Sequence, residues 1–83
     1  MIKAYILLTV NVGYTQTVLD EIKKLKHLES VAVVTGQVDI VITVKVETLE
    51  DLYDISFVKL SNIKGIDHVT THVVEKEILT EAD

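Results

Sequence analysis

A strict alternation of apolar side chains over residues 2–12 constrains the fold more than any other feature of this 83-residue chain. Successive side chains of a strand point to opposite faces, so this pattern predicts a strand with one fully apolar face. That face is formed by Ile2, Ala4, Ile6, Leu8, Val10 and Val12. A chain of this length builds one core, so the remaining elements must cover that face within a single domain.

The rest of the chain predicts two helices and three further strands. Apolar residues recur at helical spacing over residues 15–27, and two short β-rich runs, 31–35 and 40–46, predict a hairpin. Thr48 is a candidate N-cap for a second helix that ends near Asn62 and carries the stripe Leu49, Leu52, Tyr53, Ser56, Phe57 and Leu60. Gly65 supplies a turn into a last strand, residues 66–74.

This order of elements, βαββαβ, predicts a ferredoxin-like α+β fold. We expect a four-stranded antiparallel sheet with both helices on one face, and the handedness of the crossovers places the first and third strands in the centre. Residues 1–74 form the expected domain, and residues 75–83 form an acidic C-terminal tail.

The helices can cover only one face of this sheet. The other face is expected to carry Tyr5, Leu7, Thr9, Val34, Val41 and Thr43. A surface this apolar is larger than a monomer usually leaves in water. We therefore expect two subunits to pack through their sheets, as a dimeric α+β barrel with two-fold symmetry.

Composition excludes several classes of function. The chain has no cysteine, which rules out disulfides, thiolate metal sites and a cysteine nucleophile. Its net charge is −5 and its eight basic residues are all lysine, so direct binding of DNA or RNA is not expected. No stretch is apolar enough to span a bilayer and no secretory signal precedes the first strand, so we expect a cytoplasmic protein without membrane contact.

The most informative local motif is the turn formed by Thr35, Gly36, Gln37, Val38 and Asp39, called here the G-x-x-D turn. Glycine lets a ligand approach the backbone closely, and Asp39 places a carboxylate beside exposed N–H donors. An amino acid needs both, because its carboxylate requires donors and its ammonium requires an acceptor. Gly and Asp between strands also simply build hairpins, which is their commonest use.

The turn, the strand after it and the segments Ile63-Lys64-Gly65-Ile66 and Thr71-His72-Val73-Val74 resemble the effector-binding domain of the Lrp/AsnC feast-famine regulators, often called the RAM domain. The resemblance implies dimers that assemble into a ring, an octamer or a decamer, with amino acids bound at interfaces near the G-x-x-D turn. It implies Thr71, and also Thr70, as hydroxyl partners of the ligand. Val38 departs from the aromatic residue that the family often has there.

Regulators of this family carry a DNA-reading helix-turn-helix before this domain, whereas here the first strand begins at residue 2. We therefore expect a stand-alone domain that binds an amino acid and modulates transcription by assembling with a full-length regulator, without touching DNA. We expect neither catalysis nor a cofactor. Two alternatives stay open: a purely structural assembly partner, and a small enzyme, since this architecture hosts several functions.

Histidines supply the remaining candidates for chemistry. His68 and His72 have the spacing of a helical zinc pair, but on a strand they lie roughly 13 Å apart, so we predict no metal site within a subunit. An enzyme would instead use these histidines with Tyr5 and Asn11, in a polar pocket between sheet and helices.

Overall fold

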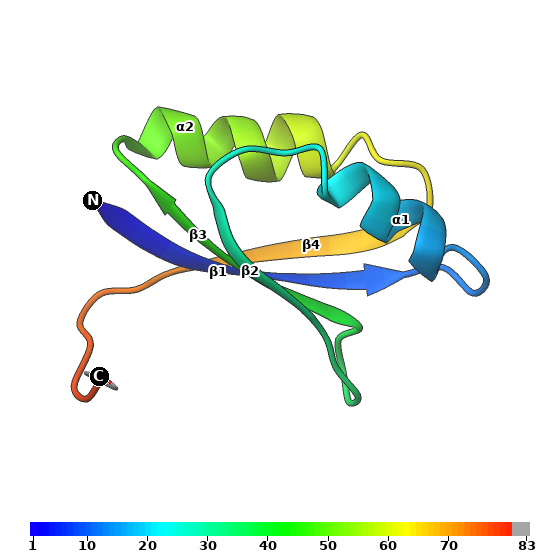
Figure 1. The fold of residues 1–83 in the computed structure, drawn as a ribbon, viewed down its shortest axis with the longest axis horizontal. Helices are drawn as coiled ribbons and strands as arrows, with labels where there is room; N and C mark the ends of the chain where they lie inside the picture. The colour runs from blue at the N-terminus through cyan, green and yellow to red at the C-terminus, as the bar shows by residue number, and fades with distance from the viewer. Residues whose placement is uncertain (81–83) are drawn as a thin grey trace.

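The computed structural model describes residues 1–80 and contains a four-stranded antiparallel sheet with both helices on one side (Figure 1). The elements in chain order are β1 (Ile2–Val10), α1 (Thr15–Ile22), β2 (Leu28–Val33), β3 (Ile40–Val46), α2 (Leu49–Tyr53), η1 (Asp54–Leu60) and β4 (Ile66–Val73). The strand order is β2-β3-β1-β4. The predicted ferredoxin-like α+β fold is confirmed, including its central first and third strands.

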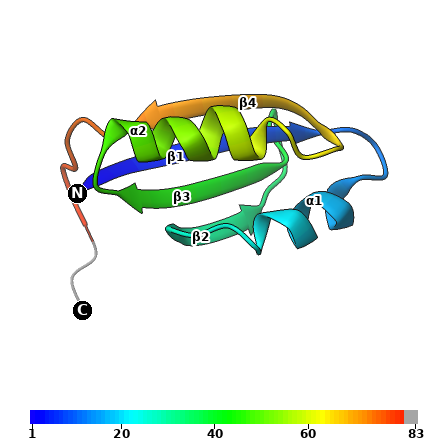
Figure 2. The same ribbon diagram turned by 90° about the horizontal axis from the view of Figure 1, so that it is seen from above.

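The core lies between the central strands and the helices. Ile6 of β1 pairs with Ile42 of β3, and Leu8 pairs with Ile40, and all four side chains are fully buried. The helices contribute Val18, Ile22, Leu52, Ile55 and Leu60 to the same cluster. Figure 2 shows the second helix running along the sheet, while α1 lies near one end. The alternation thus predicted the correct buried face for Ala4, Ile6 and Leu8. Val12 was wrongly placed on that face: β1 ends at Val10, and Val12 lies beyond it and is 99% exposed.

The opposite side of the sheet, called here the open face, is covered by neither helix. The alternation puts Tyr5, Leu7 and Thr9 of β1 there, and Tyr5 and Leu7 pair with Thr43 and Val41 of β3. Tyr5 is 38% exposed, while Leu7 and Val41 are half-buried. Dimerisation through this face remains a prediction, supported by its apolar content.

The first helix is shorter than predicted, since it ends at Ile22 instead of His27. The N–H groups of Lys24 and Leu25 donate to the carbonyls of Glu21 and Ile22, three residues back, which tightens the chain into turns. His27 then has a φ of +71°, which no α-helix contains. The lysines of this segment therefore lie beyond the helix, although Leu25 still packs against the core.

The second helix begins as predicted and ends close to Asn62, but its second half is a π-helix. Thr48 caps it, because its Oγ1 accepts a 3.1 Å hydrogen bond from the N–H of Asp51. From Asp54 to Leu60 the winding is wider, with i to i+5 contacts. Among these, the Ser61 hydroxyl donates to the carbonyl of Ser56 and the Lys59 ammonium lies 3.3 Å from the Asp54 carboxylate.

Gly65 joins this helix to β4 and packs against the start of α1. Its φ is +103°, and a Cβ built on it would lie 2.6 Å from the Cβ of Tyr14. Its carbonyl also accepts a 2.7 Å hydrogen bond from the N–H of Asn11. Only glycine fits here, because the backbone conformation and the neighbouring side chain both exclude a Cβ.

The chain after β4 has no helix or strand through residue 80, and the end of the predicted acidic tail, residues 81–83, lies outside the described residues. The Lys3 ammonium lies 3.3 Å from the Glu77 carboxylate, and this hydrogen bond raises the pKa of Lys3. Within the described part of the chain, no helix is long and apolar enough to cross a membrane.

Candidate functional site

The G-x-x-D turn lies between β2 and β3, where the sheet ends. Gly36 has a φ of +128°, and among the described residues no atom outside its neighbours lies within 4 Å of the position that a Cβ would occupy. Thr35, Gly36 and Gln37 are exposed, and Val38 and Asp39 are half-buried. The turn therefore leaves its backbone open at Gly36, and ligand binding there stays a prediction.

Asp39 is tied into the sheet by both its backbone and its side chain. Its N–H donates to the carbonyl of Leu8 at 2.8 Å, and its carbonyl accepts from the N–H of Val34 at 2.9 Å. Its Oδ2 accepts a 2.7 Å hydrogen bond from the N–H of Val10. At Val10 the pairing of β1 with β4 also shifts register, and β1 ends there, two residues earlier than predicted.

The carboxylate keeps acceptor capacity after this bond. A carboxylate has two oxygens and about four lone-pair sites. Within residues 1–80 the carboxylate of Asp39 has one hydrogen bond, which Oδ2 accepts from the N–H of Val10. Asp39 therefore both fastens the end of β1 and presents a negative charge that can accept from an ammonium group.

Thr70 and Thr71 lie on β4, at the other edge of the sheet from the hairpin. Thr71 pairs with the buried Ile6 and so lies on the helix side, whereas Thr70 pairs with Leu7 and lies on the open face. Because the two hydroxyl groups lie on opposite faces of the sheet, a ligand on one face can contact only one of them. Because β1 separates β3 from β4, by about 10 Å in all, the structure does not bring either threonine to the G-x-x-D turn of its own subunit.

Thr71 lines a groove between the second helix and β4, called here the α2–β4 groove. Its lining includes Leu49, Tyr53, Ser56, Phe57, Thr71 and Val73, around a volume of about 320 Å³. The sequence predicted the stripe of the second helix but no groove beside it. The stripe in fact divides into two rows of i, i+4 spacing: Leu52, Ser56 and Leu60 are buried, whereas Leu49, Tyr53 and Phe57 are 60–63% exposed.

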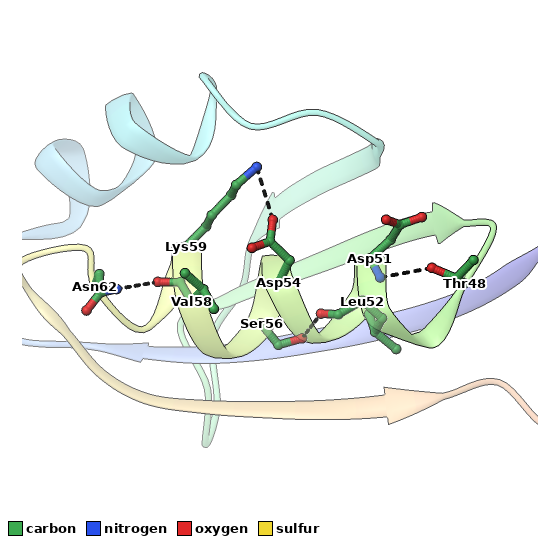
Figure 3. Close-up of polar contacts among 8 residues, drawn as sticks. All are labelled: Thr48, Asp51, Leu52, Asp54, Ser56, Val58, Lys59 and Asn62. Atoms are coloured by element: carbon green, nitrogen blue, oxygen red, sulfur yellow. Dashed lines mark hydrogen bonds and ion pairs between the residues drawn. The ribbon is translucent and has the colours of Figure 1, made fainter.

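The hydroxyl groups of the groove differ in their hydrogen bonding. The buried Ser56 hydroxyl donates to the carbonyl of Leu52 at 2.8 Å, as Figure 3 shows, and is thereby held against its own helix. The Thr71 Oγ1 is buried and has no hydrogen-bond partner among the described residues. A buried hydroxyl without a partner is destabilising, so Thr71 can gain from a polar atom that reaches it.

A second groove lies between the end of α1 and the end of η1, with a volume of about 460 Å³. Lys24, Lys59 and Lys64 line it together with Glu21. Glu21 binds Lys24 at 2.8 Å and raises its pKa, and Asp54 lies 3.3 Å from Lys59. Two of the three ammonium groups therefore have a carboxylate partner, which leaves little net charge for an anion.

The residues named for an enzyme are not gathered around a pocket. Tyr5 and His72 are cross-strand neighbours on the open face, and Asn11 is exposed beyond the end of β1. His68 is exposed and its Nδ1 lies 3.0 Å from the carboxylate of Asp67. None of the four lines either groove. Residues 1–80 contain no group of three or more side chains arranged to hold a metal ion.

Comparison with known proteins assigns a family to this architecture. The family model of the Lrp/AsnC ligand binding domain matches residues 3–82, nearly the whole chain. No curated protein matches significantly.

Solved structures share the fold at low sequence identity. TTHA0845 from Thermus thermophilus has a TM-score of 0.88 at 24% identity, over 96% of this chain and 100% of its own. AsnC of E. coli has a TM-score of 0.89 at 17% identity, over 99% of this chain and 56% of its own. The regulator NMB0573 of Neisseria meningitidis, solved as a complex with L-Met, has a TM-score of 0.87 at 16% identity, over 95% of this chain and 53% of its own. The chain thus spans about half the length of these two longer proteins.

Proposed function

The chain belongs to the family of Lrp/AsnC ligand binding domains, and from this premise we propose that it is a non-enzymatic module that binds an amino acid and assembles with other subunits. Assembly into a ring, an octamer or a decamer, and association with a longer Lrp/AsnC regulator in the cytoplasm are part of this proposal. In this way the module modulates transcription without binding DNA. Its acidic, arginine-free composition supports the last point.

The observation that carries the proposal is the G-x-x-D turn, where open backbone at Gly36 lies beside the half-buried carboxylate of Asp39. Backbone N–H groups suit the carboxylate of an amino acid, and Asp39 suits its ammonium. The chain has no arginine to take the first role. The complex of NMB0573 with L-Met supports an amino acid as the ligand class.

The two predicted halves of the site lie at opposite edges of the sheet, so the ligand would bind between subunits. One subunit contributes its G-x-x-D turn, and a neighbouring subunit contributes Thr71 of β4. This arrangement makes binding depend on assembly, and by linkage makes assembly depend on binding.

A thermal-shift screen against the twenty amino acids, run beside light scattering, tests the proposal. A ligand at a hundredfold excess over its Kd stabilises the native state by about 2.7 kcal/mol, which raises the melting temperature. We expect a selective rise with few amino acids. A stable assembly that responds to none would contradict effector binding.

A structural assembly partner is the second candidate, and the hydrogen bonds of Asp39 favour it. Its N–H, its carbonyl and one carboxylate oxygen all hold the β1–β3 and β2–β3 pairs together, which is a sufficient reason for an aspartate at this position. Mixed assemblies with a longer regulator that form equally well with and without amino acids would select this candidate.

A further inference from the structure

We infer that the segment after β4 docks in the α2–β4 groove of another copy of this chain, with Ile78 and Leu79 as the anchoring side chains. This inference rests on the assembly part of the proposed function, since it names a segment and a surface that join two subunits. It is independent of ligand binding at the G-x-x-D turn.

The α2–β4 groove leaves apolar surface exposed. Leu49, Tyr53 and Phe57, called here the outer row, are 60–63% exposed on the second helix, and Val73 of β4 is 50% exposed. The rings of Tyr53 and Phe57 pack with their centroids 5.0 Å apart. Within residues 1–80 no charged side chain lines the groove. The groove therefore favours apolar side chains over charged ones, which would lose water without gaining a partner.

The segment after β4 carries side chains that match this surface. Ile78 and Leu79, called here the apolar pair, are 82% and 91% exposed, on a stretch without helix or strand. Residues 75–77 before them are all charged, whereas residues 78–80 are uncharged. The apolar pair is therefore the part of this segment that fits an uncharged groove, and burying it there removes both apolar surfaces from water.

The segment is held away from the groove of its own subunit. The N–H of Val74 donates to the carbonyl of Lys3 at 2.8 Å, and the Lys3 ammonium lies 3.3 Å from the Glu77 carboxylate. The Lys3 side chain lies on the open face, where its ammonium is 5.9 Å from the ring centroid of Tyr5. The groove lies on the helix side, and Figure 1 shows the segment leaving the sheet on the side opposite to the helices. A second copy therefore supplies the groove that this segment can fill.

The contact is small, so it strengthens an assembly instead of forming one alone. The ion pair between Lys3 and Glu77 is partly exposed to water, so little energy opposes a movement of the segment toward another subunit. Each copy carries one segment and one groove, so the same contact repeats through a symmetric assembly.

Cross-linking tests the contact, because the chain has no cysteine and one can be placed on each side of it. Leu49→Cys leaves the two rings of the groove in place, and Thr80→Cys leaves the apolar pair in place. When the two variants are co-expressed and treated with a short bismaleimide, we expect a cross-link between them, identified by mass spectrometry. Val12→Cys with Thr80→Cys is the control, since Val12 is 99% exposed but follows the opposite end of β1 from the groove. An equal yield in the control would overturn the inference.

Analytical ultracentrifugation measures how much the contact contributes. The double variant Ile78→Ser, Leu79→Ser should weaken the assembly at least roughly tenfold. Its circular dichroism spectrum should not change, because both side chains are exposed within the subunit. Val12→Ser removes an exposed apolar side chain elsewhere and should leave the assembly as strong as that of the unaltered chain.

The outcomes separate this inference from the proposed function. If the double variant assembles as strongly as the unaltered chain, the docking contact falls while assembly and effector binding still stand. If the cross-link forms only within a chain that carries both cysteines, the segment occupies its own groove and the inference is overturned. If the unaltered chain is a monomer at every concentration, the assembly part of the proposed function falls as well.

Discussion

The carboxylate of Asp39 accepts a 2.7 Å hydrogen bond from the backbone N–H of Val10, and this bond joins the start of β3 to the end of β1. The residue that we propose as the ammonium partner of an effector thus also supports the sheet. Its structural and its binding roles can be separated, because the first needs only an acceptor oxygen and the second needs a charge.

Stability should distinguish two substitutions of Asp39. Asp39→Ala leaves the N–H of Val10 without its acceptor, and we expect it to lower the free energy of unfolding by about 1–3 kcal/mol. Asp39→Asn keeps an acceptor oxygen in place, so we expect a loss of less than about 1 kcal/mol. Urea denaturation measures both, and equal losses would show that the charge, not the hydrogen bond, stabilises the end of β1.

Gly65→Ala should be among the most destabilising single substitutions. The left-handed backbone costs about 1–2 kcal/mol for a residue with a Cβ, and the contact with Tyr14 adds a steric term of about 1–3 kcal/mol. Gly13→Ala is the control, since Gly13 has a φ of +86° but open space around it among the described residues. If thermal melts show that the two variants lose equal stability, the steric contact with Tyr14 does not contribute to the cost of Gly65→Ala.

Thr48→Ala should lower the free energy of unfolding by about 1 kcal/mol, because the N–H of Asp51 loses its cap. Thr48→Ser retains a hydroxyl oxygen and should retain most of the stability. Chemical denaturation of the pair checks this, and a serine variant as unstable as the alanine variant would mean that the threonine methyl, not the cap, matters.

Leu7→Lys should disrupt dimerisation while the subunit still folds. Leu7 lies at the middle of the open face, and a lysine there would bury a charge between two sheets. We expect at least a roughly tenfold weaker dimer in analytical ultracentrifugation, with an unchanged circular dichroism spectrum. Val58→Lys is the control, because Val58 is 42% exposed on the helix side and lines neither groove. A Leu7→Lys variant that assembles like the unaltered chain would contradict packing through the sheets.

The sheet was predictable from the sequence because a strand with one buried face has apolar side chains at every second residue. β3 has the predicted bounds, Ile40–Val46, and the alternation assigned the buried face of β1 correctly up to Val10. The bounds of β2 were wrong: it spans Leu28–Val33 instead of 31–35, because its pairing with β3 already begins at Leu28, opposite Val44. The end of α1 was not predictable from periodicity, since the left-handed conformation of His27 depends on how the chain enters β2. The π-helix was not predictable either, because seven residues are too few for its apolar spacing to differ recognisably from that of an α-helix.

The candidate site was predicted only in part. The turn was visible from Gly36 and Asp39, because their backbone and charge properties are local. The bond from Val10 to Asp39 was missed, since it joins residues 29 positions apart. Thr70 and Thr71 point to opposite faces of the sheet, because they are neighbours on a strand. This could have been predicted from the sequence. The α2–β4 groove could not be predicted, because it depends on where the second helix lies over β4. That position determines which of the two rows of apolar residues on the helix is buried.

The most direct test is the affinity of the unaltered chain and of Asp39→Asn for the amino acid that raises the melting temperature most. We predict a selective amino-acid ligand and a Kd at least roughly tenfold weaker in Asp39→Asn, with assembly size and stability close to those of the unaltered chain. Equal affinity in the two proteins would contradict the role of Asp39, and no binding to either would contradict effector sensing by this domain.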